Sequence, residues 1–242
     1  MPAWRSVQRE MKKIKNRETR SCVIIPAYNE ESIIGKVLKG VLNVCRHIIV
    51  VDDGSSDSTV KKVLDYPVTL LRHPLNLGQG AALQTGIDYA LTLPMDFIVT
   101  FDADGQHTPK EIPALVKVCQ TGGYDVVLGS RFVSGGKAVS ISPERRFMLK
   151  MATLFTRWTT GLTVTDTHNG FRVFTKHAAS QIHINHNGMA HASEILSQIA
   201  QLKLKYTEAP VTIHYTAYSK KKGQSLLNAI NILWDIWTAR LK

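Results

Sequence analysis

Short apolar runs alternate with amphipathic segments along most of this 242-residue chain. The apolar runs predict β-strands at residues 21–26, 47–51, 68–71, 97–101 and 125–129. The amphipathic segments predict helices at residues 30–42, 58–64, 80–91, 109–120 and 144–158. Strands that alternate with helices of about 10–15 residues build βαβ units around a parallel sheet. The order of the segments therefore predicts an α/β fold, with a mostly parallel, Rossmann-like sheet flanked by helices.

No linker and no change of composition divides the chain, so we expect one domain with two appendages. We place a basic extension at residues 1–20, the domain at 21–218, and a basic loop with an amphipathic helix at 219–242. The three cysteines are scattered and form no CxxC pair. This excludes a disulfide framework and a zinc site, and it indicates a reducing compartment.

The net charge of +11 is concentrated at the two ends of the chain, while the body is nearly neutral. Basic ends suit an anionic membrane face or nucleic acid, and they also suit a tail that only aids solubility. The sequence has no recognised nucleic-acid motif, so we expect no nucleic-acid partner. It has no apolar run of about 18 residues and no signal peptide. We therefore expect a cytoplasmic protein, peripheral on the cytoplasmic face of a membrane.

The segment at residues 226–237 spreads apolar side chains, including two tryptophans, over most of a helical surface. Basic residues lie at both of its ends. This pattern is typical of a helix that lies in a membrane interface. It equally suits a helix that docks on the domain or on another subunit, so an oligomer or a small membrane-protein partner stays open.

Polar side chains follow the ends of four predicted strands, where ligands gather in parallel α/β sheets. These residues are Asn29, Glu30, Asp52, Asp53, Asp102, Asp104 and Arg131. Because successive strand residues face opposite ways, we expect only one of Asp52 and Asp53 to reach the cleft. Arg131 could grip a phosphate with its planar fork, or it could form an ion pair at the rim of the sheet.

The strongest pattern is Asp102-Ala103-Asp104, with Gln106 two residues later. On an extended backbone, residues i and i+2 point to the same side, so two carboxylates leave the strand together. They repel unless a cation or a shared proton lies between them. Hard oxygen ligands suit Mg²⁺ or Mn²⁺, which predicts a metal site. The alternative is a capped Asp-Gly turn.

Two further acids draw attention because of their surroundings. Asp166 belongs to a polar run that also holds a glycine and Arg172, and Glu194 lies among apolar residues on a predicted helix. A carboxylate in apolar surroundings is either paired or functional. The run from Asn76 to Leu83 is not a dinucleotide loop, because Leu83 occupies the third glycine position of GxGxxG.

Seven short motifs, in their order along the chain, resemble those of family 2 glycosyltransferases with the GT-A fold. They read IIPAYNEE, VVDDGSSDST, NLGQGAALQTG, FDADGQH, GSRF, DTHNGFR and KKKGQS. The resemblance covers roughly residues 21–225, and it is strongest to the dolichyl- and polyprenyl-phosphate sugar synthases. It implies a metal-dependent, inverting transfer of a sugar from a GDP- or UDP-sugar to a polyprenyl phosphate, in cell-envelope glycan synthesis.

The resemblance also implies roles for individual residues. The donor nucleotide would be bound by Pro26, Ala27, Tyr28, Glu30, Val51, Asp53, Asp102, Ala103, Asp104 and Lys220. The metal would be held by Asp102, Asp104 and Gln106. Together with two candidate bases that the residues themselves suggest, Asp166 and Glu194, we expect the catalytic residues to be Asp104, Arg131, Asp166 and Glu194. The sequence departs from the family at Gln79 and Leu226, where many relatives carry a basic residue.

A second interpretation is transfer to a sugar hydroxyl of a surface glycan. A hydroxyl acceptor needs a general base within hydrogen-bonding reach, whereas a phosphate is already an anion at neutral pH. The candidate bases are Asp166 and Glu194. The sequence shows none of the additional transmembrane helices that some relatives carry, so we expect a lipid acceptor to be reached through the protein surface or through a membrane partner. An inactive scaffold is a further alternative, which the intact acidic pair disfavours.

Overall fold

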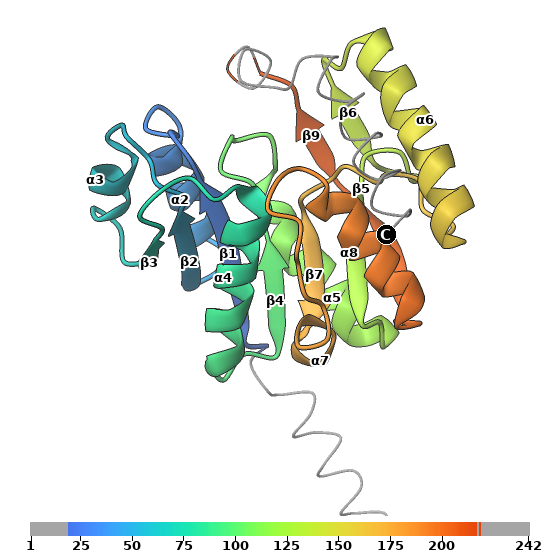
Figure 1. Cartoon of the computed structure of the whole chain (residues 1–242), viewed down its shortest axis with the longest axis horizontal. Coiled ribbons are helices and arrows are strands. Elements are labelled where there is room, and N and C mark those ends of the chain that lie inside the picture. The colour runs from blue at the N-terminus through green and yellow to red at the C-terminus, as the bar shows by residue number, and fades with distance from the viewer. Residues whose placement is uncertain (1–18, 217, 219–242) are drawn as a thin grey trace, which may run out of the picture.

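The computed structural model describes residues 19–216 and 218, and its centre is a seven-stranded sheet (Figure 1). In spatial order the strands are β3 (Thr69–Arg72), β2 (His47–Asp52), β1 (Ser21–Ala27), β4 (Phe97–Thr100), β7 (Arg172–Thr175), β5 (Val126–Ser130) and β8 (Tyr206–Pro210). Neighbouring strands are parallel except at β7, which runs antiparallel to both β4 and β5. The predicted α/β class with a mostly parallel sheet is confirmed.

Helices cover both faces of this sheet (Figure 1). One face packs against α2 (Ile34–Leu42) and α5 (Ile112–Gly122), and the other against α4 (Gln79–Thr92), α7 (Lys176–Ala179) and α8 (His191–Gln201). Successive residues of each strand enter opposite cores, as Val23 and Ile24 of β1 do. Burial on both faces explains why the strands read as continuous apolar runs.

The remaining elements lie at the edges of the sheet. The short α3 (Thr59–Val63) packs against α2 and β2, and the turn η1 (Pro109–Glu111) leads into α5. A second, two-stranded parallel sheet pairs β6 (Lys137–Val139) with β9 (Thr212–His214). Directly after β6 comes α6 (Pro143–Thr160), which begins at the N-cap Ser142 and packs against α8 at the outside of the molecule (Figure 1).

The predicted elements agree with the structure to within about four residues, and the largest difference is at the first helix. The segment predicted at residues 30–42 becomes helical only at Ile34. The residues before it form a turn, in which the carbonyl of Glu30 accepts the backbone N–H groups of Ile33 and Ile34. The sequence interpretation missed β6, β7, β8 and β9, because their three to five residues mix polar with apolar side chains and form no continuous apolar run.

Several predictions lie outside the described residues. They are most of the basic extension at residues 1–20, the loop that contains Lys220, and the amphipathic helix at residues 226–237. Within the part of the chain that the structure describes, no helix has both the length and the apolar character that crossing a bilayer requires.

Replacing Phe174 of β7 with alanine tests this arrangement. Phe174 is fully buried in the core on the α4 side of the sheet, so Phe174→Ala should lower the free energy of unfolding by about 3–5 kcal/mol. The matched control is Leu64→Ala, because Leu64 is 69% exposed, and its effect should stay within about 0.5 kcal/mol. Urea denaturation of the two variants measures both. Equal losses would contradict a central position for β7.

Candidate active site

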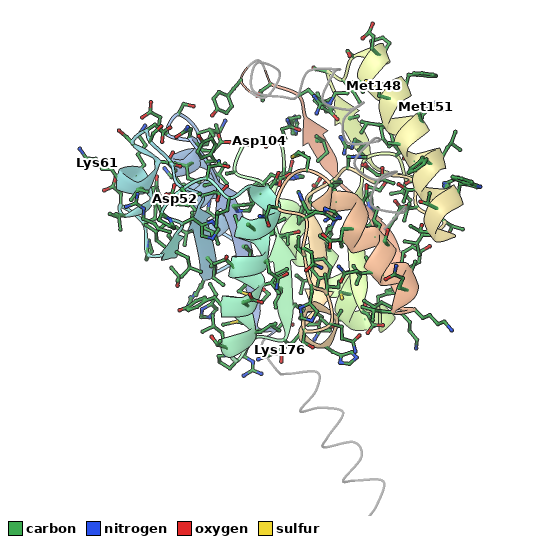
Figure 2. The ribbon with its side chains drawn as sticks, in the orientation of Figure 1. Asp52, Lys61, Asp104, Met148, Met151 and Lys176 are labelled. Atoms are coloured by element: carbon green, nitrogen blue, oxygen red, sulfur yellow. The ribbon has the colours of Figure 1, made fainter. Side chains whose placement is uncertain are left out.

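A cavity of about 950 Å³ opens at the carboxyl ends of the central strands. Ten predicted site residues line it, namely Pro26, Ala27, Tyr28, Glu30, Asp53, Asp102, Ala103, Asp104, Gln106 and Arg131. Asp104 lies on one side, and Met148 and Met151 of α6 lie on the other (Figure 2). The cavity therefore joins a polar half, made by strand ends, to an apolar half made largely by α6.

Asp102 follows β4 and is held by two side chains. One carboxylate oxygen accepts a hydrogen bond from the amide of Gln79 at 3.0 Å, and the other is 2.9 Å from Nε2 of His107. Gly170 lies against the same carboxylate, and a Cβ there would collide with both of its oxygens. A glycine is therefore required at residue 170 for Asp102 to take this position.

Asp104 turns into the cavity beside Asp102 and accepts the backbone N–H of Gln106 at 3.0 Å. Burial, followed by the charge of Asp102, raises the pKa of Asp104 to about 6. Burial also disfavours the charged form of Asp102, but the hydrogen bond and charge of His107 outweigh it and lower the Asp102 pKa. The pair thus carries closely spaced negative charge, which a cation would stabilise.

The side chains at this position fit a divalent cation that a substrate helps to hold. Among the described residues, no group of three or more histidine, cysteine or acidic side chains could bind a metal by itself. Mg²⁺ is commonly held by only one or two carboxylates together with substrate phosphates. Asp102 and Asp104 supply hard oxygens of that kind, and Gln106 lines the cavity beside them.

Of the two acids that end β2, only Asp53 lines the cavity, as the alternation of strand residues predicts. Its carboxylate accepts the backbone N–H groups of Leu77 and Gly78 at 2.9 and 2.8 Å, and it is 2.8 Å from Nδ1 of His73. Asp52 instead pairs with Arg72 at 3.4 Å. Asp53 therefore fixes the loop that leads into α4. Val51 is fully buried in the sheet and does not line the cavity.

The turn after β1 brings Tyr28 and Glu30 to the cavity wall. Asn29 adopts a left-handed backbone conformation, with φ of 52°, and its side chain accepts the backbone N–H of Ser56 at 2.9 Å. Glu30 is almost fully buried, and its carboxylate accepts the hydroxyl of Tyr218 at 2.6 Å. Tyr28 lines the cavity and is 42% exposed.

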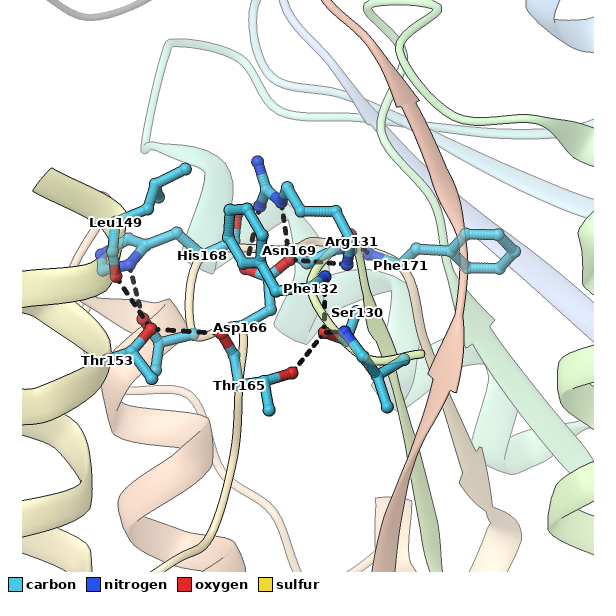
Figure 3. A network of polar contacts seen from close by, with 12 residues as sticks. Ser130, Arg131, Phe132, Leu149, Thr153, Thr165, Asp166, His168, Asn169 and Phe171 are labelled. Atoms are coloured by element: carbon cyan, nitrogen blue, oxygen red, sulfur yellow. Dashed lines mark hydrogen bonds and ion pairs between the residues drawn. The ribbon is translucent and has the colours of Figure 1, made fainter. Parts of the chain in front are cut away.

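Arg131 is buried in an ion pair with Asp166 (Figure 3). Nε and one terminal nitrogen reach the two Asp166 oxygens at 2.6 and 3.0 Å, and the guanidinium also donates to the carbonyl of His168 and the hydroxyl of Tyr215. Burial opposes the charge of Arg131, but Asp166 outweighs it and raises the pKa. Of the two roles that the sequence allowed for Arg131, the structure shows the ion pair. Arg131 also lines the cavity.

Neither candidate base lines the cavity. Both oxygens of Asp166 are occupied by Arg131. Glu194 accepts the backbone N–H groups of Asn185 and His186 at 2.9–3.1 Å, so its carboxylate is paired and fixes the loop before α8. The structure brings Asp102, Asp104, Asp53 and Arg131 to one cavity, whereas Asp166 and Glu194 do not line it.

The sequence interpretation missed the residues that support the acidic pair. His107 packs against Phe101 and Phe171, and its Nδ1 is buried without a hydrogen-bond partner among the described residues. Arg172 and His191 are also buried close to Asp102. Burial lowers the pKa of Arg172 to about 10 and that of His191 to about 4. The only signal was that His107 and Arg172 end two quoted motifs, FDADGQH and DTHNGFR.

The family model of Glycosyl transferase family 2 matches residues 22–182. Over 88% of this chain, it is 31% identical to a UDP-N-acetylglucosamine–dolichyl-phosphate N-acetylglucosaminyltransferase of Methanococcus voltae, of which 93% is covered. It is 32% identical to an undecaprenyl-phosphate mannosyltransferase of Micrococcus luteus, and the match covers 92% of this chain and 99% of that protein.

Among solved structures, the fold is similar to that of glucosyl-3-phosphoglycerate synthase from Mycobacterium tuberculosis in complex with Mn²⁺, UDP-glucose and phosphoglyceric acid. The TM-score is 0.66, with 93% of this chain and 82% of that chain covered, at 19% sequence identity. At this identity the similarity concerns the fold alone, and it agrees with the seven-stranded sheet described above.

His191 makes the stability of the fold depend on pH. Its folded pKa of about 4 lies below its ordinary value of 6.5, so between these values the unfolded chain binds a proton that the folded chain does not. The stabilisation is complete above pH 6.5 and is lost as the pH falls toward 4, by up to about 3 kcal/mol. His191→Gln should make the fall in unfolding free energy between pH 7 and 4.5 shallower.

The control for this experiment is His183→Gln, because the His183 side chain is exposed. It should leave the pH dependence of the parent protein unchanged. If His191→Gln and the parent lost stability in parallel over this pH range, the claim that His191 is buried in its neutral form would be contradicted.

Proposed function

This chain belongs to glycosyl transferase family 2 and is a glycosyltransferase of the GT-A fold, and we propose that it moves a sugar from a nucleoside diphosphate sugar to a polyprenyl phosphate. One observation carries the proposal. A single cavity has an acidic pair, Asp102 and Asp104, on one side and the apolar side chains of α6 on the other. The two relatives named above are, by their names, enzymes that use dolichyl or undecaprenyl phosphate.

The donor would bind along the carboxyl ends of β1, β2 and β4. Tyr28, Glu30 and Asp53 would face the nucleoside, and Asp102, Asp104 and Gln106 would hold Mg²⁺ or Mn²⁺ against the diphosphate. A bound divalent cation acts as a Lewis acid that neutralises charge on a departing diphosphate. His107 and Gln79 would keep Asp102 in place during this step, because each bonds one of its oxygens. Lys220 is proposed to close over the same diphosphate.

The acceptor would enter along α6. Phe147, Met148, Met151 and Phe155 give this wall an apolar surface suited to an isoprenoid chain. Arg131 and Arg145 also line the cavity and would attract the acceptor phosphate. The phosphate oxygen is already anionic, so it can attack the anomeric carbon in line and invert it without a general base. Because such an acceptor lies in a bilayer, we propose a peripheral protein at the cytoplasmic face of a membrane.

The geometry favours a phosphate acceptor over a sugar hydroxyl. A hydroxyl acceptor needs a base within reach, but Asp166 is bound on both oxygens and Glu194 holds backbone N–H groups outside the cavity. Neither can approach an acceptor hydroxyl without breaking these bonds.

Removing the charge of the acidic pair should abolish transfer. We expect Asp104→Asn and Asp102→Asn each to lower turnover about 100-fold or more, because negative charge for the cation is lost. The control is Asp88→Asn on α4, where Asp88 is exposed and bonds Gln84. Transfer is measured with Mg²⁺ and Mn²⁺ on GDP- and UDP-sugars. Near-normal turnover in a folded Asp104→Asn variant would contradict the metal site.

The acceptor is tested by pairing each polyprenyl phosphate with the alcohol of the same chain length. We expect transfer to the phosphate and none to the alcohol, since neither candidate base, Asp166 or Glu194, lines the cavity. Glu194→Gln should then keep near-normal turnover, because glutamine retains an oxygen for the loop. Transfer to the alcohol or to a glycan hydroxyl, or no turnover with any lipid phosphate, would overturn the proposed acceptor.

A further inference from the structure

The helix α6 carries its large apolar side chains on the outside of the molecule. Phe147, Met151, Leu154 and Trp158 are spaced four, three and four residues apart, which puts them in one row on the helix. All four are exposed, Phe147 by 65% and Trp158 by 76%. The buried residues of this helix are instead Thr153 and Thr156. A surface helix of a water-soluble domain normally has the reverse arrangement.

Cationic side chains accompany this row. Arg146, Lys150 and Arg157 are exposed, and by helical periodicity they lie together along one border of the apolar row. The acidic residue of the helix, Glu144, is at its first turn. Along the other border, Met148 and Phe155 line the cavity, together with Phe147 and Met151 of the row itself. The exposed row is thus continuous with the apolar half of the active-site cavity.

We infer that this row of α6 inserts into the surface of an anionic lipid bilayer. Apolar side chains enter the boundary between headgroups and acyl chains, while the adjacent cations contact anionic headgroups. Tryptophan favours this interfacial layer because its ring has an apolar body and a polar N–H. The sequence had indicated a membrane element only at residues 226–237, outside the described part of the chain. The row on α6 is a second surface, built into the folded domain.

A bilayer suits this surface better than a second copy of the chain. The helix carries four cationic residues and one acidic residue, so two copies facing each other would bring like charges together. An anionic bilayer complements the same charges. The biological purpose of this membrane contact rests on the proposed function. If the acceptor is a polyprenyl phosphate, its prenyl chain would pass from the bilayer into the cavity along Met151 and Phe147.

Vesicle binding tests this surface without any sugar transfer. The full chain is mixed with phosphatidylcholine vesicles that contain phosphatidylglycerol, and the bound fraction is measured by sedimentation. We expect Leu154→Ser with Trp158→Ser to weaken binding about tenfold or more, because two exposed apolar side chains that would enter the bilayer are lost. Leu64→Ser with Leu202→Ser removes two comparably exposed leucines elsewhere and should leave binding unchanged.

The same pair of variants separates this inference from the proposed function. Leu154 and Trp158 do not line the cavity. The α6 variant should therefore lose transfer to long-chain polyprenyl phosphate in vesicles but keep transfer to a short, water-soluble isoprenyl phosphate. If no lipid phosphate is used at all, the proposed function fails while vesicle binding still reports on α6. Equal vesicle binding by the α6 and control variants would overturn the inference.

Fluorescence of Trp158 assigns the contact to this row and not to another segment. Trp4, Trp234 and Trp237 are replaced by phenylalanine in the full chain, so that Trp158 is the sole emitter. We expect its emission to shift to shorter wavelength on adding anionic vesicles, and less so at high salt. Vesicle binding without a shift would overturn the inference. Emission at short wavelength before vesicles are added would also overturn it. If that shift grew with protein concentration, the row would contact a second copy of the chain, and if it did not, the row would contact another segment of the same chain.

Discussion

Asp102 leaves the central strand β4 with both carboxylate oxygens already hydrogen-bonded, one to Gln79 and one to His107. These two partners come from elements on different sides of the strand end, the start of α4 and the turn after Asp104. The carboxylate fits only because residue 170 is a glycine, carried there by the antiparallel strand β7. The position of the Asp102 carboxylate therefore depends on three separate segments, which carry Gln79, His107 and Gly170. The geometry of the acidic pair, Asp102 and Asp104, depends on that position.

The rest of the site divides by the kind of element that builds it. Parallel strands bring Glu30, Asp53 and Asp102 to one edge of the sheet, which makes the polar half of the cavity. The apolar half comes from α6, which follows the small β6–β9 sheet outside the central layers. The buried Arg131–Asp166 pair fixes the loop after β5, and Arg131 lines the cavity. A charged donor and a lipid acceptor would thus meet where the polar half of the cavity joins the apolar half.

Much of this arrangement could be predicted from the sequence, because parallel strands that are buried on both faces leave long apolar runs with polar residues at their ends. That pattern located five of the nine described strands, the cavity edge and the acids Asp53, Asp102 and Asp104. Contacts between distant segments left no such pattern. The pairing of Asp166 with Arg131, of Glu194 with its loop and of His107 with Asp102 depends on packing that only the fold determines. The outward face of α6 was hidden because helical periodicity does not say which side faces water.

The most direct test of the central claim is a crystal of the protein grown with Mn²⁺ and UDP or GDP, with diffraction recorded at the manganese edge. The account predicts an anomalous peak within bonding distance of a carboxylate oxygen of Asp102 or Asp104 and of the diphosphate, with the nucleoside against Tyr28 and Asp53. A nucleotide bound in this cavity without a metal peak at the acidic pair, or a peak at other residues, would contradict it.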